Sequence, residues 1–168
     1  MNELHPIVPD DFDVPAVLEH PRFRLRMLTI HDLIKDYDAV MSSVAHLQGT
    51  YSALWGADWP AGLTLEEDLI DLGWHQREFT LGTSFAYTMM APDESRCLGC
   101  LYINPTRKGG HDAAVTLWVR ADELESGLDE VLYEAAREWI AQAWPFTSPA
   151  FPGRAITAAD WRSLRERP

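Results

Sequence analysis

The sequence has few cysteines, a deficit of basic residues and no long apolar run. Two cysteines in 168 residues provide no disulfide framework, and a chain of this length can bury enough surface to be stable without one. Basic residues number 14 against 26 acidic ones, so the formal net charge is −12. Because this surface would repel phosphates, we expect no nucleic-acid partner.

Membrane insertion and secretion are not expected either. The longest apolar run, CLGCLYI, is far shorter than the ~20 residues that span a bilayer. The N-terminus, MNELHPIVPDDFDVP, is acidic and Pro-rich, whereas a signal peptide is basic and then apolar. We therefore expect a cytoplasmic protein without a membrane partner.

The two cysteines, Cys97 and Cys100, form a Cys-x-x-Cys pattern, which is typical of redox dithiols and of half zinc sites. Residues three apart in a strand point to opposite faces, and CLGCLYIN is strand-like, so we expect the two sulfurs to diverge. No histidine stands at a spacing that would complete a zinc site. Two ordinary strand thiols and no metal are predicted, and a thiol or metal protein is the less favoured alternative.

The first half of the chain is predicted to contain an arm, a strand and two helices. Residues 1–21 have no period and form an arm that lies over the surface or lacks fixed structure, and residues 22–168 form one domain. Alternation in RFRLRML predicts a strand that begins near Arg22. Thr29 is the expected N-cap of a helix over residues 30–45, and Thr64 with Glu67 that of a helix to about residue 79.

The stretch between these helices, residues 46–63, has no clear period and is interpreted as an ordered loop. Its tryptophans, Trp55 and Trp59, either line a cleft or cover the core, and the second reading is favoured. At the end of the following helix, His75 and Glu78 lie three apart, so an acid/base pair and a solvated helix face are both open, with the second favoured.

The second half is predicted to form a sheet covered by helices. Strands over residues 84–91, 97–104 and 113–120 are joined by short Pro- and Gly-containing links that suit antiparallel neighbours. A helix runs from Leu128 to before Pro145, then a short edge strand, and a last helix begins at Thr157 with Asp160. The expected order is βααβββα followed by a short β and α, with no internal repeat.

This order, with FRLRMLTIHDLIKDYDAVMSS leading and AAVTLWVRADELESGLDEVL at the centre, resembles the GCN5-related N-acetyltransferase superfamily over residues 22 to about 146. Gly99 also falls where that family often has a glycine. The resemblance implies an α/β (α+β) fold with a mixed, mainly antiparallel sheet and helices on both faces. It also implies acetyl-CoA as acyl donor, with the thioester along Leu117, Trp118 and Val119 and the phosphates at the amides of Ser126, Gly127 and Leu128.

The phosphate loop departs from the family pattern. An Arg or Gln, then Gly and a second Gly followed by a small residue are expected, and Leu124, Glu125, Gly127 and Asp129 stand at these positions. The carboxylates would lie against a pyrophosphate, at a cost on the order of one to a few kcal/mol. Asp and Glu in a first helical turn instead stabilise the helix dipole, and Ser126 with Asp129 resembles a capping box.

Two hypotheses for function follow from this pattern. The first is an acyl-CoA-dependent N-acetyltransferase-like protein that transfers an acetyl group to an unidentified small-molecule or peptide amine. The second is a non-catalytic binding or assembly module that kept the fold and lost coenzyme A binding. No residue matches the family's aromatic general acid, so the catalytic residues are unidentified.

Arg154 lies in a Pro- and Gly-containing turn and is expected to have a structural role in packing, with anion binding as the alternative. The short segment after Phe146 leaves a sheet edge for the arm, the last helix or a second subunit to cover, so a homodimer stays open.

Overall fold

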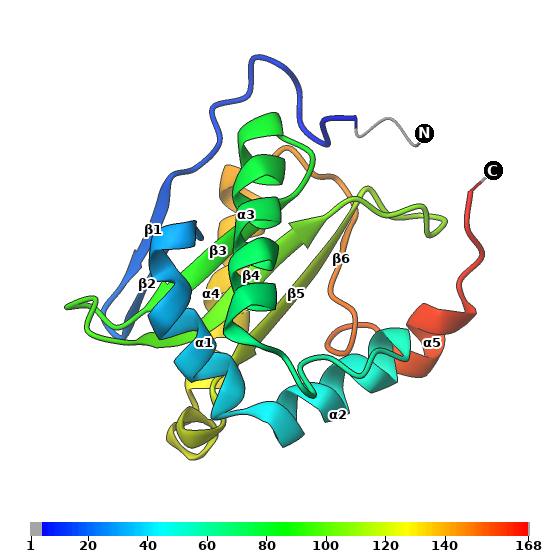
Figure 1. Cartoon of the computed structure of the whole chain (residues 1–168). Helices are drawn as coiled ribbons and strands as arrows, with labels where there is room; N and C mark the ends of the chain where they lie inside the picture. The colour runs from blue at the N-terminus through cyan, green and yellow to red at the C-terminus, as the bar shows by residue number, and fades with distance from the viewer. Residues whose placement is uncertain (1–4, 168) are drawn as a thin grey trace.

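The computed structural model describes residues 5–167, which form one mixed sheet covered on both faces (Figure 1). Six strands lie in the order β1-β2-β3-β4-β5-β6, the first five antiparallel and β6 parallel to β5. Their bounds are Val17–His20 (β1), Phe23–Met27 (β2), Phe85–Met90 (β3), Cys97–Asn104 (β4), Ala113–Val119 (β5) and Pro149–Ala150 (β6). The predicted mixed, mainly antiparallel sheet is confirmed.

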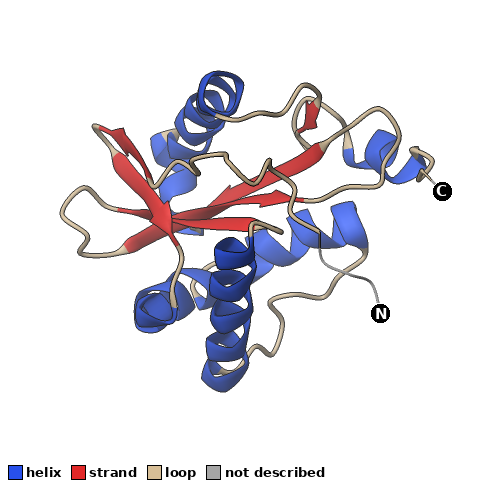
Figure 2. Cartoon of the chain, turned by 90° about the horizontal axis from the view of Figure 1, so that it is seen from above, coloured by secondary structure: helices blue, strands red, loops and turns tan. Residues whose placement is uncertain are grey.

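Helices cover the two faces of this sheet unequally (Figure 2). One face carries η1, α1, α2 and α3, the other carries α4, and α5 packs against α2. A short 3-10 helix, η2, joins β5 to α4. The bounds are Ile30–Asp32 (η1), Leu33–Met41 (α1), Val44–Trp55 (α2), Leu65–Leu81 (α3), Ala121–Ser126 (η2), Leu128–Ala143 (α4) and Ala158–Ser163 (α5).

Each face of the central strands has its own hydrophobic core. On the α4 face, Tyr87 and Phe85 contact an aromatic group that includes Trp139 and Trp144. On the opposite face, Trp118 lies with the two cysteines against α1, α2 and α3. Because β3 and β5 are buried on both faces, their sequences are apolar apart from one buried threonine each, Thr88 and Thr116, and do not alternate.

A β-bulge in β4 changes the direction of its side chains. Met89 pairs with Gly99 and Met90 with Cys97, so Leu98 is the extra residue. Cys97 and Cys100 therefore point to the same face and lie in the same core cluster. The prediction that the two sulfurs diverge is wrong, because an inserted residue reverses the alternation on one side of it.

Gly99 at this bulge permits an unusually close approach of β5. A Cβ built there would lie 2.0 Å from the Trp118 carbonyl oxygen, a distance that no side chain tolerates. The bulge and the tight β4–β5 pairing therefore both require glycine at this position.

Two elements differ from the prediction in the first half of the chain. β1 pairs with β2 over Val17 to His20, within the expected arm, and the residues before it pack on the core: Phe12 lies against Trp144, and Tyr87 donates a hydrogen bond of 2.6 Å to the Pro15 carbonyl. α2 occupies most of the expected loop. Leu47, Tyr51 and Leu54 lie on one face of α2 at helical spacing, and Leu47 and Leu54 are buried. Gly49 and the exposed Trp55 interrupt the apolar pattern, so this spacing is hard to recognise in the sequence.

Helix starts were predicted with mixed success. Thr64 and Glu67 form the expected reciprocal capping box at α3, and the Thr157 side chain accepts from the Asp160 amide at α5. The box expected from Ser126 and Asp129 is absent from the described structure. Gly127, at φ 73°, is the N-cap of α4, and Ser126 bonds backwards to Glu123 instead.

The segment after α4 covers the edge of β5. Trp161 of α5 packs with Leu54 of α2, Ala114 of β5 and Ala150 of β6. The last helix is thus one of the three covers that the sequence left open. Among the described residues, no helix combines the length and apolar character needed to cross a bilayer.

Candidate active site

β5 and β6 separate after only two residue pairs. Ala113 pairs with Pro149 and Ala114 with Ala150, and the chain then turns away, with the Arg154 amide donating to the Phe151 carbonyl. Beyond Ala114, β5 therefore has no strand neighbour on this side within residues 5–167. We call the space along residues 115–119 of this edge the β5 gap.

Arg154 reaches from the turn into the β5 gap. Its guanidinium donates two hydrogen bonds to the Asp129 carboxylate, one of them 2.8 Å from Nη2 to Oδ1, and Nη2 lies 3.5 Å from the Leu117 carbonyl oxygen. The same guanidinium stacks over the Tyr133 ring at 5.4 Å. We call this two-point ion pair the Arg154–Asp129 clasp. It joins the free edge of β5 to the first turn of α4.

The residues predicted to hold the thioester lie on both faces of β5. The side chains of Leu117 and Val119 belong to the α4-side core and that of Trp118 to the opposite core. Only backbone groups can therefore face the gap from this strand, and the Leu117 carbonyl accepts from Arg154.

The residues predicted to hold the phosphates lie at the junction of η2 and α4. The Ser126 hydroxyl donates to the Glu123 carbonyl at 2.8 Å, and the Gly127 amide donates to the Leu124 carbonyl at 3.2 Å. Leu128 is buried as the first residue of α4. The Asp129 carboxylate, held by Arg154, stands in the first helical turn, where the helix dipole favours an anion.

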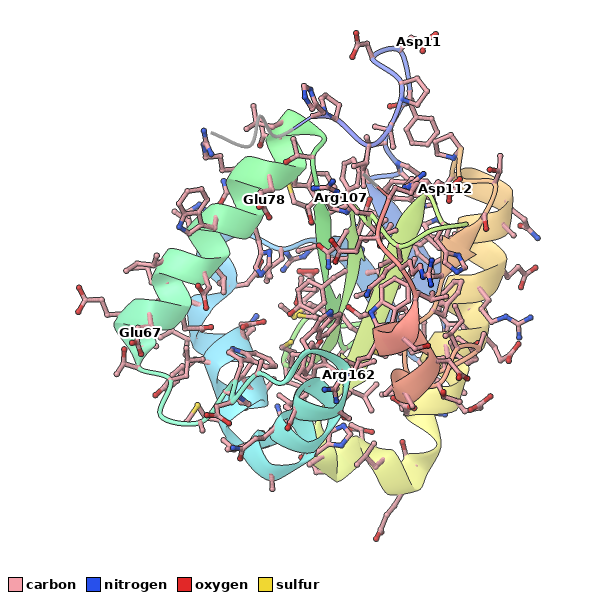
Figure 3. The ribbon with its side chains drawn as sticks, turned by 90° about the vertical axis from the view of Figure 1, so that its right-hand side faces the viewer. Asp11, Glu67, Glu78, Arg107, Asp112 and Arg162 are labelled. Atoms are coloured by element: carbon pink, nitrogen blue, oxygen red, sulfur yellow. The ribbon has the colours of Figure 1, made fainter. Side chains whose placement is uncertain are left out.

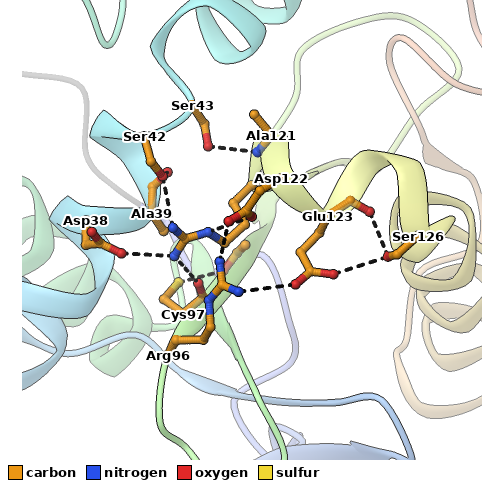
Figure 4. Close-up of polar contacts among 12 residues, drawn as sticks. Asp38, Ala39, Ser42, Ser43, Arg96, Cys97, Ala121, Asp122, Glu123 and Ser126 are labelled. Carbon is orange, nitrogen blue, oxygen red and sulfur yellow. Dashed lines mark hydrogen bonds and ion pairs between the residues drawn. The ribbon is translucent and has the colours of Figure 1, made fainter.

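Two other acids of the loop, Asp122 and Glu123, are paired with arginines, one of which, Arg96, comes from a distant part of the sequence (Figure 4). Asp122 accepts from Arg96 at 2.6 Å and from Arg120 at 2.9 Å, and Glu123 accepts from Arg96 at 3.4 Å. Burial opposes ionisation of Asp122, but the hydrogen bond from Arg96 and the charge of Arg120 hold its pKa below the ordinary value. Of the three acids in η2, only Glu125 is exposed with no hydrogen bond or ion pair to another described residue.

A pocket of about 400 Å³ lies on the face opposite α4, between α1, α2 and α3 and the strands β4 and β5. Its walls combine four aromatic residues with three carboxylates and a histidine. We call it the acidic pocket; it is lined by Leu28, Asp36, Tyr51, Trp55, Trp59, Asp68, Asp71, Leu72, His75, Tyr102, Asn104 and Thr116.

Three polar atoms of this lining are buried without a hydrogen-bond partner among the described residues: the Tyr51 hydroxyl, Asp68 Oδ2 and His75 Nδ1. A buried polar atom without a partner is costly unless a ligand or water meets it. Burial, and then the charge of Asp71, raise the pKa of Asp68 to about 6. Burial lowers the pKa of His75, which is therefore neutral, and raises that of Tyr51, which keeps its proton.

His75 and Glu78 are not a solvated pair. The His75 ring lies 5.3 Å from the Tyr102 ring, against the sheet, and its Nδ1 stands 3.9 Å from the Glu78 carboxylate, beyond hydrogen-bond distance. Trp55 and Trp59 line the pocket rather than only covering the core. Figure 3 shows Glu67 at the opposite end of α3 and Arg162 on the α5 helix that packs against α2.

Several pocket residues were not predicted, although α3 carried a readable signal. Asp68, Asp71 and His75 are spaced three and four apart, which places them on one helical face. Tyr51 lies in the segment that the sequence analysis interpreted as a loop.

The two sites meet at Thr116, because it lines the pocket from β5 while the carbonyl of the next residue, Leu117, faces the clasp. The charge of Arg154 reaches the Tyr51 hydroxyl and opposes the rise of its pKa.

Comparison with solved structures identifies this arrangement. RimL, a ribosomal L7/L12 alpha-N-protein acetyltransferase solved with coenzyme A, superposes with a TM-score of 0.60 at 17% identity, over 75% of this chain and 68% of that chain. The chain has the fold of the GCN5-related N-acetyltransferases. No protein-family model matches the sequence, and a search of curated proteins finds no match.

Two further acetyltransferase-fold structures agree. The ribosomal-protein-S5-alanine acetyltransferase from Vibrio fischeri superposes with a TM-score of 0.54 at 12% identity, over 77% of this chain and 69% of that one. The microcin C7 self-immunity acetyltransferase MccE, in complex with acetyl-CoA and AMP, does so with a TM-score of 0.56 at 10% identity, over 74% and 67%. At these identities the likeness establishes the acetyltransferase fold, and the chemistry of this chain has to be argued from its own residues.

Proposed function

We propose that this protein is an acyl-CoA-dependent N-acyltransferase whose acceptor is a small cationic amine. The observation that carries the proposal is the pair of sites on β5: a gap in the sheet on one side of the strand and the acidic pocket on one of its faces, meeting at Thr116 and Leu117. A bisubstrate reaction needs two approaches to one point, and this strand supplies both.

The acidic pocket suits a primary ammonium group. Asp68 and Asp71 supply charge, and Trp55, Trp59 and Tyr51 supply aromatic faces that attract a cation by ~0.5 to 2 kcal/mol each. Its volume of about 400 Å³ is at the lower end for small-ligand sites, which limits the acceptor to a polyamine or the N-terminus of a peptide. RimL, which shares the fold, acetylates the N-terminus of a ribosomal protein, so a peptide amine belongs among the probes.

The β5 gap suits the pantetheine arm of the donor, provided that the clasp opens. The Leu117 carbonyl would then be free for hydrogen bonding, and Arg154, released from Asp129, is a guanidinium that can pair with phosphate. Asp129 opposes the same phosphate. The clasp thus lowers the affinity for the donor without removing the site.

The chain also provides groups that move protons at the meeting point. When bound, the donor supplies an activated acyl group. Asp68 and Asp71 hold the amine, and neutral His75, with its free Nδ1, can accept the proton that the amine must lose. The protonated Tyr51 hydroxyl can give a proton to the departing sulfur, which is the role left without a residue by the sequence.

The test is a turnover assay with acetyl-CoA and each of two acceptors, spermidine and a short peptide with a free N-terminal serine. The expected result is acetylated amine by mass spectrometry with an equal amount of released coenzyme A thiol. Cys97 and Cys100 are buried, so they give little background in the thiol measurement. No product with either acceptor at millimolar donor would reject the proposal.

A second candidate function is a non-catalytic amine-binding module, and the clasp itself favours it. Arg154 and Asp129 satisfy each other at the place where a phosphate would be needed, so the protein is complete without a cofactor. The two candidates differ in one outcome: both predict that spermidine binds, and only the enzyme predicts a shift of the melting temperature with acetyl-CoA.

A further inference from the structure

A second cluster of reactive side chains lies beneath the acidic pocket. One ligand atom each from Asp36, Cys97 and Cys100 lie within 4.8 Å of one another, and the Cys100 sulfur is 3.5 Å from Asp36 Oδ1. The proposed acyl transfer uses none of these groups. We call the three residues the thiol–carboxylate cluster.

The β4 bulge creates this cluster. Without the extra residue Leu98, the two cysteines would point to opposite faces, as a regular strand requires. With it, both sulfurs face α1 and meet Asp36, whose helix packs on β4. Gly99 is needed for the bulge to lie against β5. The extra residue Leu98, Gly99 and the Cys-x-x-Cys spacing of β4 together place both sulfurs beside Asp36.

The cluster is buried, and among the described residues its carboxylate has no paired cation; the Arg120 guanidinium donates instead to the backbone carbonyl of Cys97 at 3.2 Å. Asp36 is 4% exposed and both cysteines are 0% exposed. Among the described residues, no basic side chain forms an ion pair with Asp36, and its one side-chain hydrogen-bond partner is the Cys100 thiol. A buried carboxylate is stable only with a proton or with a cation.

The donor set and spacing fit a thiophilic divalent ion. Around a tetrahedral zinc, with sulfurs at ~2.3 Å and oxygens at ~2.0 to 2.2 Å, neighbouring ligand atoms lie ~3.5 to 3.8 Å apart. The Cys100–Asp36 distance of 3.5 Å already agrees with this value. Asp36 also lines the acidic pocket, which supplies an entry path and room for a water as fourth ligand.

We propose that Asp36, Cys97 and Cys100 bind one zinc ion, with the fourth position open to the acidic pocket. On binding, the ion replaces the protons of the two thiols and of the carboxyl, and these protons pass to solvent. The ion ties α1 to the bulged end of β4. Because three protons leave as two positive charges arrive, the cluster gains one net negative charge at the base of the pocket, which suits a cationic acceptor.

The first test is metal analysis of the full chain purified from zinc-supplemented medium without chelator. The expected result is about one zinc per chain, removed by a strong chelator with a fall in melting temperature. Refilling with cobalt(II) should give sulfur-to-cobalt charge-transfer absorption, which requires thiolate ligands. No bound zinc together with no such absorption would overturn the proposal, whether or not any variant folds.

Variants then assign the ligands. Zinc binding should weaken by at least about 100-fold in each of Cys97→Ser, Cys100→Ser and Asp36→Asn. Loss of a residue that only hydrogen-bonds a metal ligand weakens binding by about 10- to 100-fold, so a larger effect indicates a direct ligand. Asp71→Asn, a pocket carboxylate outside the cluster, is the matched control and should keep one zinc. Equal zinc content in Asp71→Asn and Cys100→Ser would contradict the assignment, even if the wild type binds metal.

Discussion

Arg154 holds Asp129 across the gap between β5 and the start of α4, by two hydrogen bonds, and its third contact is the Leu117 carbonyl. The carboxylate stands in the first turn of α4, where the helix dipole favours an anion. An internal ion pair therefore fills the position at which the proposed function would set a phosphate of the donor. This relationship explains how an acidic loop can persist in an acetyltransferase fold.

The clasp should contribute to stability. Arg154→Ala leaves Asp129 half-buried without a partner, so the free energy of unfolding should fall by about 1 to 2 kcal/mol. Arg137→Ala is a matched control, because Arg137 also stacks on Tyr133 but pairs with an exposed carboxylate, and should cost about 0.5 kcal/mol or less. Urea unfolding measures both. Equal losses in the two variants would show that the clasp has no special role.

The β4 bulge should tolerate no side chain at Gly99. Gly99→Ala should destabilise the protein by about 1 to 3 kcal/mol or more, because the added Cβ would meet the Trp118 carbonyl. Gly49→Ala is the control: it lies inside α2 with no atom within 4 Å of its added Cβ, and should stabilise by about 0.5 to 1 kcal/mol. Thermal unfolding of both variants checks the pair, and a harmless Gly99→Ala would contradict the register of β4 on β5.

Amine binding should depend on the ionisation of Asp68. With its pKa at about 6, this group is neutral below that pH and charged above it, so the affinity for spermidine should rise from about pH 5 to about pH 7. Asp68→Asn should bind spermidine about tenfold or more weakly, with a flatter pH profile. Glu66→Gln, an exposed change on the same helix, should leave both unchanged. Calorimetric titration at several pH values decides, and an unchanged profile in Asp68→Asn would assign the dependence to another group.

The same carboxyl predicts the sign of a stability change. Because the pKa of Asp68 is higher in the folded chain than its ordinary value of about 3.8, the folded state binds more protons between these two pH values. The free energy of unfolding should therefore fall as pH rises from about 4 to about 6. Subtracting the pH profile of Asp68→Asn from that of the wild type isolates this contribution, and a rise in the difference would contradict the burial of the group.

Tyr51 should affect turnover rather than binding. If its hydroxyl gives the proton to the departing sulfur, Tyr51→Phe should lower kcat by about 10²- to 10⁴-fold with KM for the amine little changed. Tyr37→Phe is the control, since that hydroxyl donates to the Leu63 carbonyl outside the pocket and should leave kcat unchanged. An unchanged kcat in Tyr51→Phe would show that water, and not Tyr51, protonates the departing sulfur.

The sequence predicted the parts of the fold that depend on local pattern. Periodicity found three central strands and α4, and capping chemistry found the start of α3 at Thr64 and Glu67. The sequence-based predictions were wrong where contacts between distant segments determine the local structure. The bulge at Leu98 depends on how β4 pairs with its neighbours, and one inserted residue reversed the expectation for the cysteines.

For the candidate site too, features of the local sequence were predicted and those that depend on distant segments were not. The loop acids were recognised from the sequence, but their partners Arg96 and Arg154 come from distant segments, so the local charge overstated the repulsion. The acidic pocket was missed because α2 was interpreted as a loop. Helical spacing of Asp68 and His75 on α3 was present in the sequence and could have indicated one shared face.

The most direct test of the account is a calorimetric titration of acetyl-CoA into the wild type, Asp129→Asn and the control Glu134→Gln. Asp129→Asn releases Arg154 and removes the carboxylate from the first turn of α4, whereas Glu134→Gln removes an exposed acid farther along the same helix. We expect weak binding to the wild type and to Glu134→Gln, and binding at least about tenfold tighter to Asp129→Asn, a gain of about 1.4 kcal/mol. No detectable heat at millimolar acetyl-CoA in any of the three proteins would contradict it.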